Sequence, residues 1–376
     1  MAGAIRQPID VDALSRYIES HVPIIKLPID IKQFGFGQSN PTYQLTAADS
    51  TKYVLRKKPP GKLLSKTAHQ VEREYKIIHA LEKTDVPVPK TYALCTDGNV
   101  IGTSFYIMEF LDGRIIEDAS MPGVSPQERN ALWQEAILTL AKFHRVNPHA
   151  VGLDDYGKPS GFYNRQIKTL GTISIAQSQA RDIETNQLVG NIPHFENVVE
   201  FFSNQALQPQ DRSTLVHGDY KIDNVVFHKT EPRVIGILDW EMSTIGHPLS
   251  DLANLLSPYT FGRTEEIRSA FPGATNLKAF SPDARLEGIP TYQQCIQWYN
   301  EVAGWDAQRD INWGAAFGAY RNSVIMQGIA ARYALRQASS AQAKDYGSKM
   351  EPFGQLGWQL VQEVKVERGG NVQSKL

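Results

Sequence analysis

The most informative stretch of the sequence is HGDYKIDN (217–224), which is followed shortly by LDWE (238–241). Asp219 and Asn224 are five positions apart, and Asp239 comes after two further apolar runs. Apolar, β-branched runs of this kind predict short strands. We place these strands at 214–216, 225–228 and 234–238. The polar residues are therefore expected on loops that a small β island holds in place.

The spacing of Asp219 and Asn224 is that of the catalytic loop H-R-D-x-x-x-x-N of protein kinases, in which a metal-binding Asp follows on a later strand. Phosphoryl transfer needs an acceptor oxygen held in line and a neutralised phosphate charge. Asp219 can accept the proton of a substrate hydroxyl, and Lys221 can reach the γ-phosphate. Asn224 and Asp239 offer the oxygen ligands that Mg²⁺ prefers. The pattern predicts a kinase that uses ATP and Mg²⁺; the alternative is a turn whose Asp and Asn cap the local backbone.

Two other residues of this loop are assigned to structure. We expect His217 to order the loop rather than to act as an acid or base. We expect Asp223 to support the loop rather than to bind the metal.

An upstream phosphate cradle is predicted at GFGQSN (35–40), which matches G-x-G-x-x-G except for its last position. Asn40 stands there, and Asn tolerates positive φ better than most residues. The alternative is an ordinary turn. The nucleotide contacts predicted here are Gly35, Gly37, Gln38 and Ser39.

The strand ending in Arg56 occupies the place of the kinase V-A-I-K strand, with Arg where Lys is expected. Arg is a planar fork and Lys a point charge, so either Arg56 grips the phosphates with two bonds or the site is altered. Its partner should be Glu74, or Glu72 as the second choice, on a helix predicted over 66–83. The backbone of Glu109 and Phe110, at the end of a further strand, is placed to contact adenine.

The order of elements predicts an α+β, bilobal, protein-kinase-like fold, with a small β-rich N-lobe and a large helical C-lobe. The N-lobe (1–111) carries a first helix over 10–20, a hairpin at 42–56 and strands near 91–95 and 103–110. The C-lobe (112–366) begins with a helix that Ser125 caps and contains a long helix over 310–338. A flexible tail is predicted at 367–376.

Composition narrows the class of protein. The chain has 376 residues, 39 Lys and Arg against 40 Asp and Glu, and a net charge of −1. A general nucleic-acid binder would show a strong basic excess, so no nucleic-acid partner is expected. Two distant cysteines, Cys95 and Cys295, exclude a disulfide scaffold and a cysteine-based zinc site. No apolar run is long enough for a membrane span.

Several strings together resemble a known family. They are VLRKKPPGKLL (54–64), HQVEREYKI (69–77), IGTSFYIMEFLDGR (101–114), HGDYKIDNVVFH (217–228) and LDWEMSTIGHPLSDLANL (238–255). On these residues the chain resembles the aminoglycoside-phosphotransferase and choline-kinase-like small-molecule kinases. Within them it is most similar to the kinase domain joined to acyl-CoA dehydrogenases of the family member 10 and 11 type. A weaker similarity continues at Tyr320–Arg321.

The resemblance implies a substrate: a hydroxyacyl-CoA, hydroxylated at C4, that is phosphorylated on that hydroxyl. It also implies a downstream acyl-CoA dehydrogenase, which we expect here as a separate chain. Asp251 resembles the carboxylate that braces the catalytic loop in this superfamily. The stretch 168–177 departs from the expected pattern, which leaves the acyl group open.

A cluster of cations lies in the first of these strings. Five of them fall within eleven residues: Arg56, Lys57, Lys58, Lys62 and Lys66. One interpretation is a solvated charged face. The other is a cradle for the phosphates of coenzyme A, which Lys and Arg contact well.

The last three residues are Ser374, Lys375 and Leu376. A terminal S-K-L is an address read by the peroxisomal import receptor. For a eukaryotic source we therefore expect a peroxisomal protein, and otherwise a cytoplasmic one. Two rival functions remain: a kinase for another small alcohol or an aminoglycoside-like substrate, and a catalytically silent pseudokinase that serves as a binding module.

Overall fold

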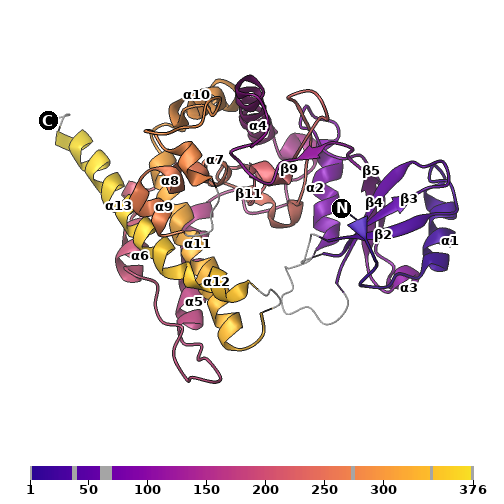
Figure 1. The fold of residues 1–376 in the computed structure, drawn as a ribbon, viewed down its shortest axis with the longest axis horizontal. Helices are drawn as coiled ribbons and strands as arrows, with labels where there is room; N and C mark the ends of the chain where they lie inside the picture. The colour runs from indigo at the N-terminus through magenta and orange to yellow at the C-terminus, as the bar shows by residue number, and fades with distance from the viewer. Residues whose placement is uncertain (1, 36–39, 60–69, 272–275, 339–341, 374–376) are drawn as a thin grey trace.

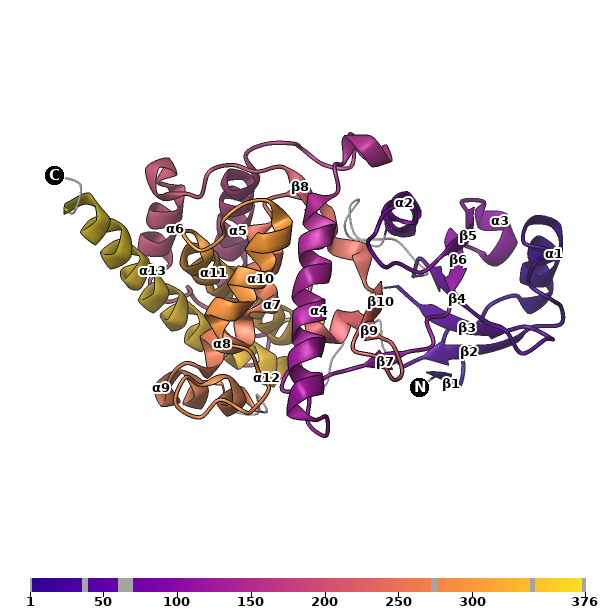
Figure 2. The ribbon, with the colours of Figure 1, turned by 90° about the horizontal axis from the view of Figure 1, so that it is seen from above.

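The computed structural model describes residues 2–35, 40–59, 70–271, 276–338 and 342–373. It consists of two lobes, a sheet-based lobe and a larger helical lobe, which lie side by side along the longest axis (Figures 1 and 2). The bilobal α+β architecture predicted from the sequence is confirmed. Both cysteines are free and buried.

The N-lobe is built on one antiparallel sheet with the strand order β1-β2-β3-β4-β6-β5. Its strands are β1 (Ala2–Gly3), β2 (Asp30–Phe34), β3 (Thr42–Thr46), β4 (Lys52–Lys57), β5 (Thr91–Cys95) and β6 (Phe105–Glu109). The predicted hairpin is β3 and β4, paired from Thr42 with Arg56 to Thr46 with Lys52. The helices are α1 (Val11–His21), α2 (Val71–Leu81) and α3 (Gly98–Ile101).

The side chains of β4 alternate between two apolar cores. Leu55 packs with Leu14 and Ile18 of α1 on one face of the sheet. Val54 packs with Val71 and Ile78 of α2 on the other face. Successive residues of a strand point to opposite faces, so α1 and α2 cover opposite sides of the sheet.

The chain crosses to the C-lobe after β6, through residues 110–113. A Cβ at Gly113 would lie 2.3 Å from the carbonyl oxygen of Phe227, so only glycine allows the two segments to approach this closely. The next strand, β7 (Arg114–Ile115), already pairs with the C-lobe strand β9 (Val225–Phe227). The connector is therefore packed against the small sheet that carries the catalytic loop.

The predicted β island is in fact two separate small sheets. β10 (Val234–Ile237), β9 and β7 form one, whereas β8 (Thr214–Val216) pairs with β11 (Thr244–Gly246). The prediction of a single island was wrong because β11, which follows LDWE, was not recognised as a strand. The loop at 217–224 therefore bridges two sheets. Two 3₁₀ turns adjoin it, η3 (Ile222–Asn224) and η4 (Trp240–Met242).

Helices make up the rest of the C-lobe. They are α4 (Pro126–Arg145), α5 (Phe162–Ser178), α6 (Phe195–Ser203), α7 (Leu249–Leu255), α8 (Ser257–Gly262), α9 (Glu265–Ser269), α10 (Tyr292–Ala303), α11 (Ile311–Ala334), α12 (Ala343–Ser348) and α13 (Met350–Gln373), with further 3₁₀ turns η1 (His149–Val151), η2 (Gln205–Leu207) and η5 (Leu277–Phe280). Ser125 caps α4 as predicted, accepting a hydrogen bond from the amide of Glu128. α11 lies at the centre, packed against α5, α7 and α13.

The end of the chain differs from expectation. α13 continues through Gln373, over most of the stretch predicted as a flexible tail at 367–376. Arg368 explains part of this, because its Nη2 lies 2.8 Å from Oδ1 of Asp310 and ties the helix to the start of α11. Residues 374–376 lie outside the described part of the chain.

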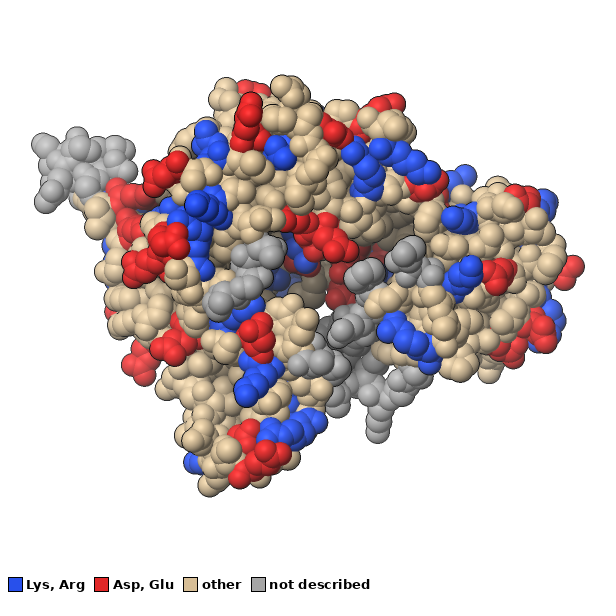
Figure 3. All heavy atoms as spheres, in the orientation of Figure 1, with Lys and Arg blue, Asp and Glu red and all other residues tan. Residues whose placement is uncertain are grey.

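Charges are mixed over the molecular surface. Figure 3 shows basic and acidic side chains interspersed on one face, with a hollow between the two lobes that acidic side chains line. None of the described helices combines the length and apolar character that a membrane span requires.

Candidate active site

The buried side chain of His217 stabilises the catalytic loop. His217 follows β8, and its Nδ1 accepts a hydrogen bond from the amide of Asp219 (3.2 Å). Its Nε2 donates to the carbonyl oxygen of Leu238 (2.8 Å). Both ring nitrogens are thus used by the backbone, which agrees with the loop-ordering role predicted for His217.

Asp251 of α7 braces the same loop, as the family resemblance implies. Its carboxylate accepts the amides of His217 (2.6 Å) and Gly218 (2.8 Å) and a hydrogen bond from Nε2 of His144 (3.2 Å). Burial alone would raise the pKa of Asp251, but the hydrogen bond and charge of His144 hold it below its ordinary value. The buried carboxylate therefore stays charged and fixes two consecutive amides.

Gly218 lets the loop turn toward η4. Its φ is +86°, and a Cβ there would lie 2.7 Å from the carbonyl oxygen of Met242. Arg321 of α11 donates from Nη2 to the carbonyl oxygen of Gly218 (2.9 Å). The sequence similarity at Tyr320–Arg321 did not reveal this contact.

Two amide side chains, those of Asn224 and Asn254, contact the carboxylate of Asp219. Nδ2 of Asn224 donates to its carbonyl oxygen (2.8 Å) and to Oδ2 (3.1 Å). Nδ2 of Asn254 lies 3.4 Å from Oδ1 and donates to the carbonyl oxygen of Tyr220 (3.1 Å). Burial raises the pKa of Asp219 although the charge of Lys221 opposes the rise. A carboxylate with a raised pKa is better suited to take a proton from a hydroxyl.

Lys221 lies beside two carboxylates. Its Nζ is 3.0 Å from Oδ2 of Asp223 and 3.8 Å from Oδ2 of Asp219. Burial would lower the pKa of Lys221, but these two charges raise it. The ammonium group therefore remains charged next to Asp219, and Asp223 serves to position it.

Asp239 comes from the turn after β10, in the left-handed conformation (φ 64°, ψ 57°). Nη2 of Arg56, on β4 of the other lobe, lies 2.9 Å from its Oδ1 and 3.4 Å from Oε2 of Glu241. Nε of Arg56 lies 2.9 Å from Oε2 of Glu74. Arg56 thus joins the helix α2 to the residues at the end of β10.

The partner of Arg56 is Glu74, which was the first of the two residues predicted for this role. It is 1% exposed and also accepts hydrogen bonds from Nδ2 of Asn40 (2.5 Å) and the hydroxyl of Tyr106 (3.1 Å). Burial raises its pKa to about 6, and the charge of Arg56 opposes the rise, so the carboxylate is charged at neutral pH. Glu72 instead pairs with Lys58 (2.6 Å).

Asn40 has a role that the sequence pattern did not suggest. It was interpreted as a substitute for a glycine with positive φ, but it is absent from the residues with positive φ in the described chain. Its amide is fully buried and holds Glu74. One signal in the sequence could have revealed this role. Asn both donates and accepts hydrogen bonds, and it stands where the G-x-G-x-x-G pattern has a glycine, which has no side chain to form them.

The other predicted nucleotide contacts are only partly described. Gly35 lies at the exposed end of β2, and no atom that the structure describes approaches its Cβ position within 4 Å. The amide of Glu109 already donates to the carbonyl oxygen of Lys90 (2.8 Å), so this N–H is not free for adenine. The ring of Phe110 stacks near that of Phe34 (centroids 6.5 Å apart). Gly37, Gln38 and Ser39 lie outside the described residues.

The predicted magnesium ligands fit a site that is completed by phosphate. Among the described residues, no three His, Cys, Asp or Glu side chains converge on one point. Mg²⁺ is commonly held by one or two protein oxygens together with substrate phosphates and water. Because Nδ2 of Asn224 faces Asp219, its Oδ1 points the other way, and Asp239 supplies a carboxylate. These two side chains are suitable for a metal that a nucleotide brings with it.

The predicted cation cradle does not form as a unit. Lys57 is 5% exposed, and its Nζ lies 3.5 Å from the carbonyl oxygen of Pro8, on the α1 face of the sheet. Burial lowers its pKa. Arg56 faces the opposite side because neighbouring strand residues alternate, and Lys58 is engaged by Glu72. Lys62 and Lys66 lie outside the described residues.

A small cavity of about 90 Å³ opens beside Asp219, between the catalytic loop, α5 and α11. Its walls include the rings of Phe162 and Phe317, with Asn254 and Arg321 at the loop. No carboxylate is among the described residues that line it. The cavity thus combines an apolar wall and one cation with Gly218 and Asn254, the chain neighbour and a contact of Asp219.

Comparisons with known proteins agree with this geometry. The profile of the phosphotransferase enzyme family matches residues 30–286. Acyl-CoA dehydrogenase family member 11 of Pongo abelii is 37% identical over 93% of the chain, and family member 10 of Mus musculus is 36% identical over 92%. The chain spans 43% and 31% of the lengths of these two relatives.

Solved structures show the same fold. A Ralstonia eutropha protein assigned to the aminoglycoside phosphotransferases is 37% identical, with a TM-score of 0.79, covering 95% of this chain and 99% of that one. The ADP-bound aminoglycoside phosphotransferase APH(2'')-Ib superimposes with a TM-score of 0.59 at 15% identity, covering 93% of this chain and 99% of that one. The chain therefore belongs to the phosphotransferase enzyme family, as a small-molecule kinase related to the kinase domains of acyl-CoA dehydrogenase family members 10 and 11.

Proposed function

We propose that this kinase transfers the γ-phosphoryl group of ATP to the hydroxyl of a hydroxyacyl-CoA, with the hydroxyl at C4. The observation that carries the proposal is the placement of Asp219 beside a carboxylate-free, partly apolar cavity. The similarity to acyl-CoA dehydrogenase family members over nearly the whole chain supports a substrate from acyl-CoA metabolism.

In this proposal the residues of the site divide the work of proton transfer, metal binding and phosphate binding. Asp219 accepts the hydroxyl proton while Asn224 and Asn254 hold its carboxylate in place. Lys221 neutralises charge on the transferred phosphoryl group. Asn224 and Asp239 would hold Mg²⁺, which would supply positive charge to the phosphate oxygens. Arg56 orients Asp239 and contacts the nucleotide phosphates, and the predicted loop at 35–39 and the backbone near Glu109 and Phe110 bind the rest of ATP.

The lining of the cavity beside Asp219 favours this acceptor over an aminoglycoside. An aminoglycoside is a polycation, and its binding requires carboxylates to neutralise it. The described lining instead includes Arg321 together with Phe162, Met242 and Phe317. Such a wall suits an alkyl chain that carries a hydroxyl and is linked to an anionic group.

The proposal also concerns where in the cell the reaction takes place. In a eukaryotic source, Ser374-Lys375-Leu376 would be read by the peroxisomal import receptor, and the proposed reaction would then belong to peroxisomal fatty-acid catabolism. An acyl-CoA dehydrogenase would then act on the phosphorylated product. Imaging of the tagged protein in cells, with and without Leu376, tests the proposed location. An unchanged distribution after the deletion of Leu376 would contradict it.

One experiment tests the proposed reaction. Phosphoryl transfer from [γ-³²P]ATP is measured across 4-hydroxyacyl-CoAs, 3-hydroxyacyl-CoAs, choline and kanamycin. We expect the highest kcat/KM with a 4-hydroxyacyl-CoA. Preferential labelling of choline or kanamycin would establish a different small-molecule kinase, and a chain that binds ADP but labels no acceptor would be the silent module.

A further inference from the structure

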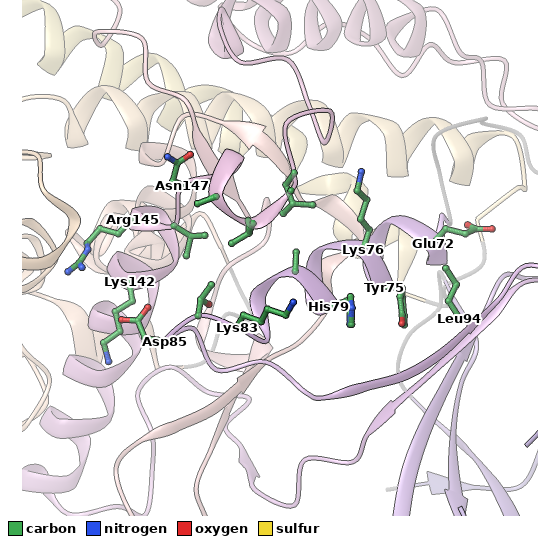
Figure 4. A pocket seen from close by; sticks show the side chains of 17 residues that line it. Glu72, Tyr75, Lys76, His79, Lys83, Asp85, Leu94, Lys142, Arg145 and Asn147 are labelled. Carbon is green, nitrogen blue, oxygen red and sulfur yellow. The ribbon is translucent and has the colours of Figure 1, made fainter. Parts of the chain in front are cut away.

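A second and larger cavity, of about 870 Å³, lies on the side of α2 that faces away from the active site. Figure 4 shows side chains of α2 along it, with Lys142, Arg145 and Asn147 at the end of α4. The lining positions on α2 include Tyr75, His79 and Lys83, whereas Glu74 belongs to the opposite, buried face. The cavity is therefore separate from the site around Asp219.

The floor of this α2 cavity is apolar. Ala80 of α2, Leu94 of β5 and Val146, Val151 and Leu153 of the C-lobe line it. Leu153 is fully buried. Cavities of 300–1,000 Å³ with apolar walls are typical binding sites for small organic molecules. The floor comes from both lobes, so an occupant would touch both.

Its rim carries an excess of cations. Lys83, Lys142 and Arg145 have no salt-bridge partner among the described residues. Lys76 pairs with Asp155 (2.5 Å), and Glu72 pairs with Lys58 (2.6 Å). Asp85 is the other carboxylate in the lining. Three cations against one carboxylate leave a net positive rim, which attracts an anion.

The helix that forms one wall also positions the active site. On its inner face, Glu74 holds Arg56, which reaches Asp239. A ligand that restricts α2 from outside therefore restricts the partner of a proposed metal ligand. This link runs through two ion pairs of 2.9 Å each.

We propose that the α2 cavity binds an amphipathic organic anion, a small molecule with an apolar body and a carboxylate or phosphate group, and that its occupation restrains α2. The apolar floor takes the body, and Lys83, Lys142 and Arg145 take the anionic group. The volume is much larger than an inorganic ion needs, which is why the ligand must be organic. The inference does not depend on the identity of the acceptor at Asp219.

Binding is tested with 1-anilinonaphthalene-8-sulfonate, a fluorescent anion with an apolar body, in the presence of saturating Mg-ADP. Ala80→Trp fills the cavity and K142E/R145E reverses the charge of its rim. We expect each variant to weaken probe binding at least tenfold. The matched control R309E/K344E reverses two exposed cations elsewhere and should bind as the parent protein does. Equal binding by all four proteins would overturn the proposal.

Competition distinguishes the two sources of the anion. Displacement of the probe by decanoate identifies a carboxylate ligand, and displacement by decyl phosphate alone identifies a phosphate ligand. Failure of both to displace it would contradict the proposal.

The restraint on α2 has its own readout. Hydrogen exchange of the amides of 71–81 should slow at least threefold when the displacing ligand is bound, and it should not slow in Ala80→Trp. Unchanged exchange in the parent protein would refute the coupling to α2. Comparison of the melting temperatures of the variants confirms that each is folded.

Discussion

Arg56 of β4 and Asp239 of the turn after β10 form an ion pair of 2.9 Å, although 183 positions separate them in the chain. The pair connects the two lobes at the point where nucleotide and metal are expected. The guanidinium of Arg56 also lies 2.9 Å from Glu74 and 3.4 Å from Glu241, so one cation serves three carboxylates. The planar fork of Arg suits this task better than the point charge of Lys, which gives a structural reason for Arg at this position.

The first prediction concerns the stability of this pair. Arg56→Met removes the cation that opposes the rise in the pKa of the buried Glu74. Removing one partner of a buried pair costs about 3–5 kcal/mol. Glu74→Gln should lower the free energy of unfolding less when Arg56 is already absent. The double mutant should therefore lose less stability than the two single variants lose together. Urea denaturation of the two single variants and the double variant measures the coupling. The exposed pair Lys229–Asp112 is the control, with an expected coupling several-fold smaller.

The second prediction concerns the base. Asp219→Asn keeps the size of the side chain but cannot accept a proton, so kcat should fall by about 10²–10⁴-fold. ADP affinity, measured by calorimetry, should change less than threefold because Asp219 is proposed to act on the acceptor rather than on the nucleotide. Turnover within tenfold of the parent enzyme would remove Asp219 from this role.

The third prediction compares two glycines with positive φ. Gly218→Ala places a Cβ 2.7 Å from the carbonyl oxygen of Met242, whereas Gly102→Ala places one in open space. Both substitutions pay about 1–2 kcal/mol of backbone strain. Only Gly218→Ala should also displace the catalytic loop and lower kcat more than tenfold. Similar kcat values for the two variants would show that the loop tolerates the contact.

The fourth prediction concerns the acceptor. Gly318 lines the cavity beside Asp219, and no atom lies within 4 Å of its Cβ position. Gly318→Leu should fill the cavity and raise KM for the acceptor at least tenfold, with little change in KM for ATP. Gly171→Leu on α5, also facing open space, is the matched control. An equal rise in both KM values would mean that the acceptor binds elsewhere.

The fifth prediction concerns pH. Burial lowers the pKa of His247 to about 4, from an ordinary value of 6.5. Between these two values the unfolded chain binds a proton that the folded chain does not, so stability present above pH 6.5 is lost as the pH falls toward 4. The loss amounts to roughly 3 kcal/mol at pH 4.

Urea denaturation at pH 7.5, 5.5 and 4.5 measures this slope. His247→Gln should flatten it, whereas replacement of the exposed His149 by Gln should leave it unchanged. A slope that persists in His247→Gln would assign the acid sensitivity to other groups.

Local patterns predicted much of this structure. The spacing of Asp219 and Asn224, the hairpin before Arg56 and the Ser125 cap each depend on a few neighbouring residues. Lys57 shows where a simple rule was available but not applied. Strand alternation alone places it on the opposite face from Arg56 and so outside any shared phosphate cradle.

Other features depend on contacts between distant segments. The pairing of β8 with β11 joins segments about 30 positions apart. Both strands are too short for their sequence pattern to predict which strand they pair with. Asn40, Asn254 and Arg321 act through hydrogen bonds to Glu74, Asp219 and Gly218. Such contacts exist only after the chain has folded, so the residue types alone could not assign them.

Arg73 and Tyr156 connect α2 to the C-lobe. The guanidinium of Arg73 lies 4.1 Å above the ring of Tyr156 and donates to its carbonyl oxygen (2.8 Å), while the Tyr156 hydroxyl lies 2.6 Å from Oγ of Ser243. α2 is thereby pinned to the segment that follows Asp239. A movement of the lobes that keeps these contacts intact would leave α2 with the C-lobe and shift the N-lobe sheet relative to it.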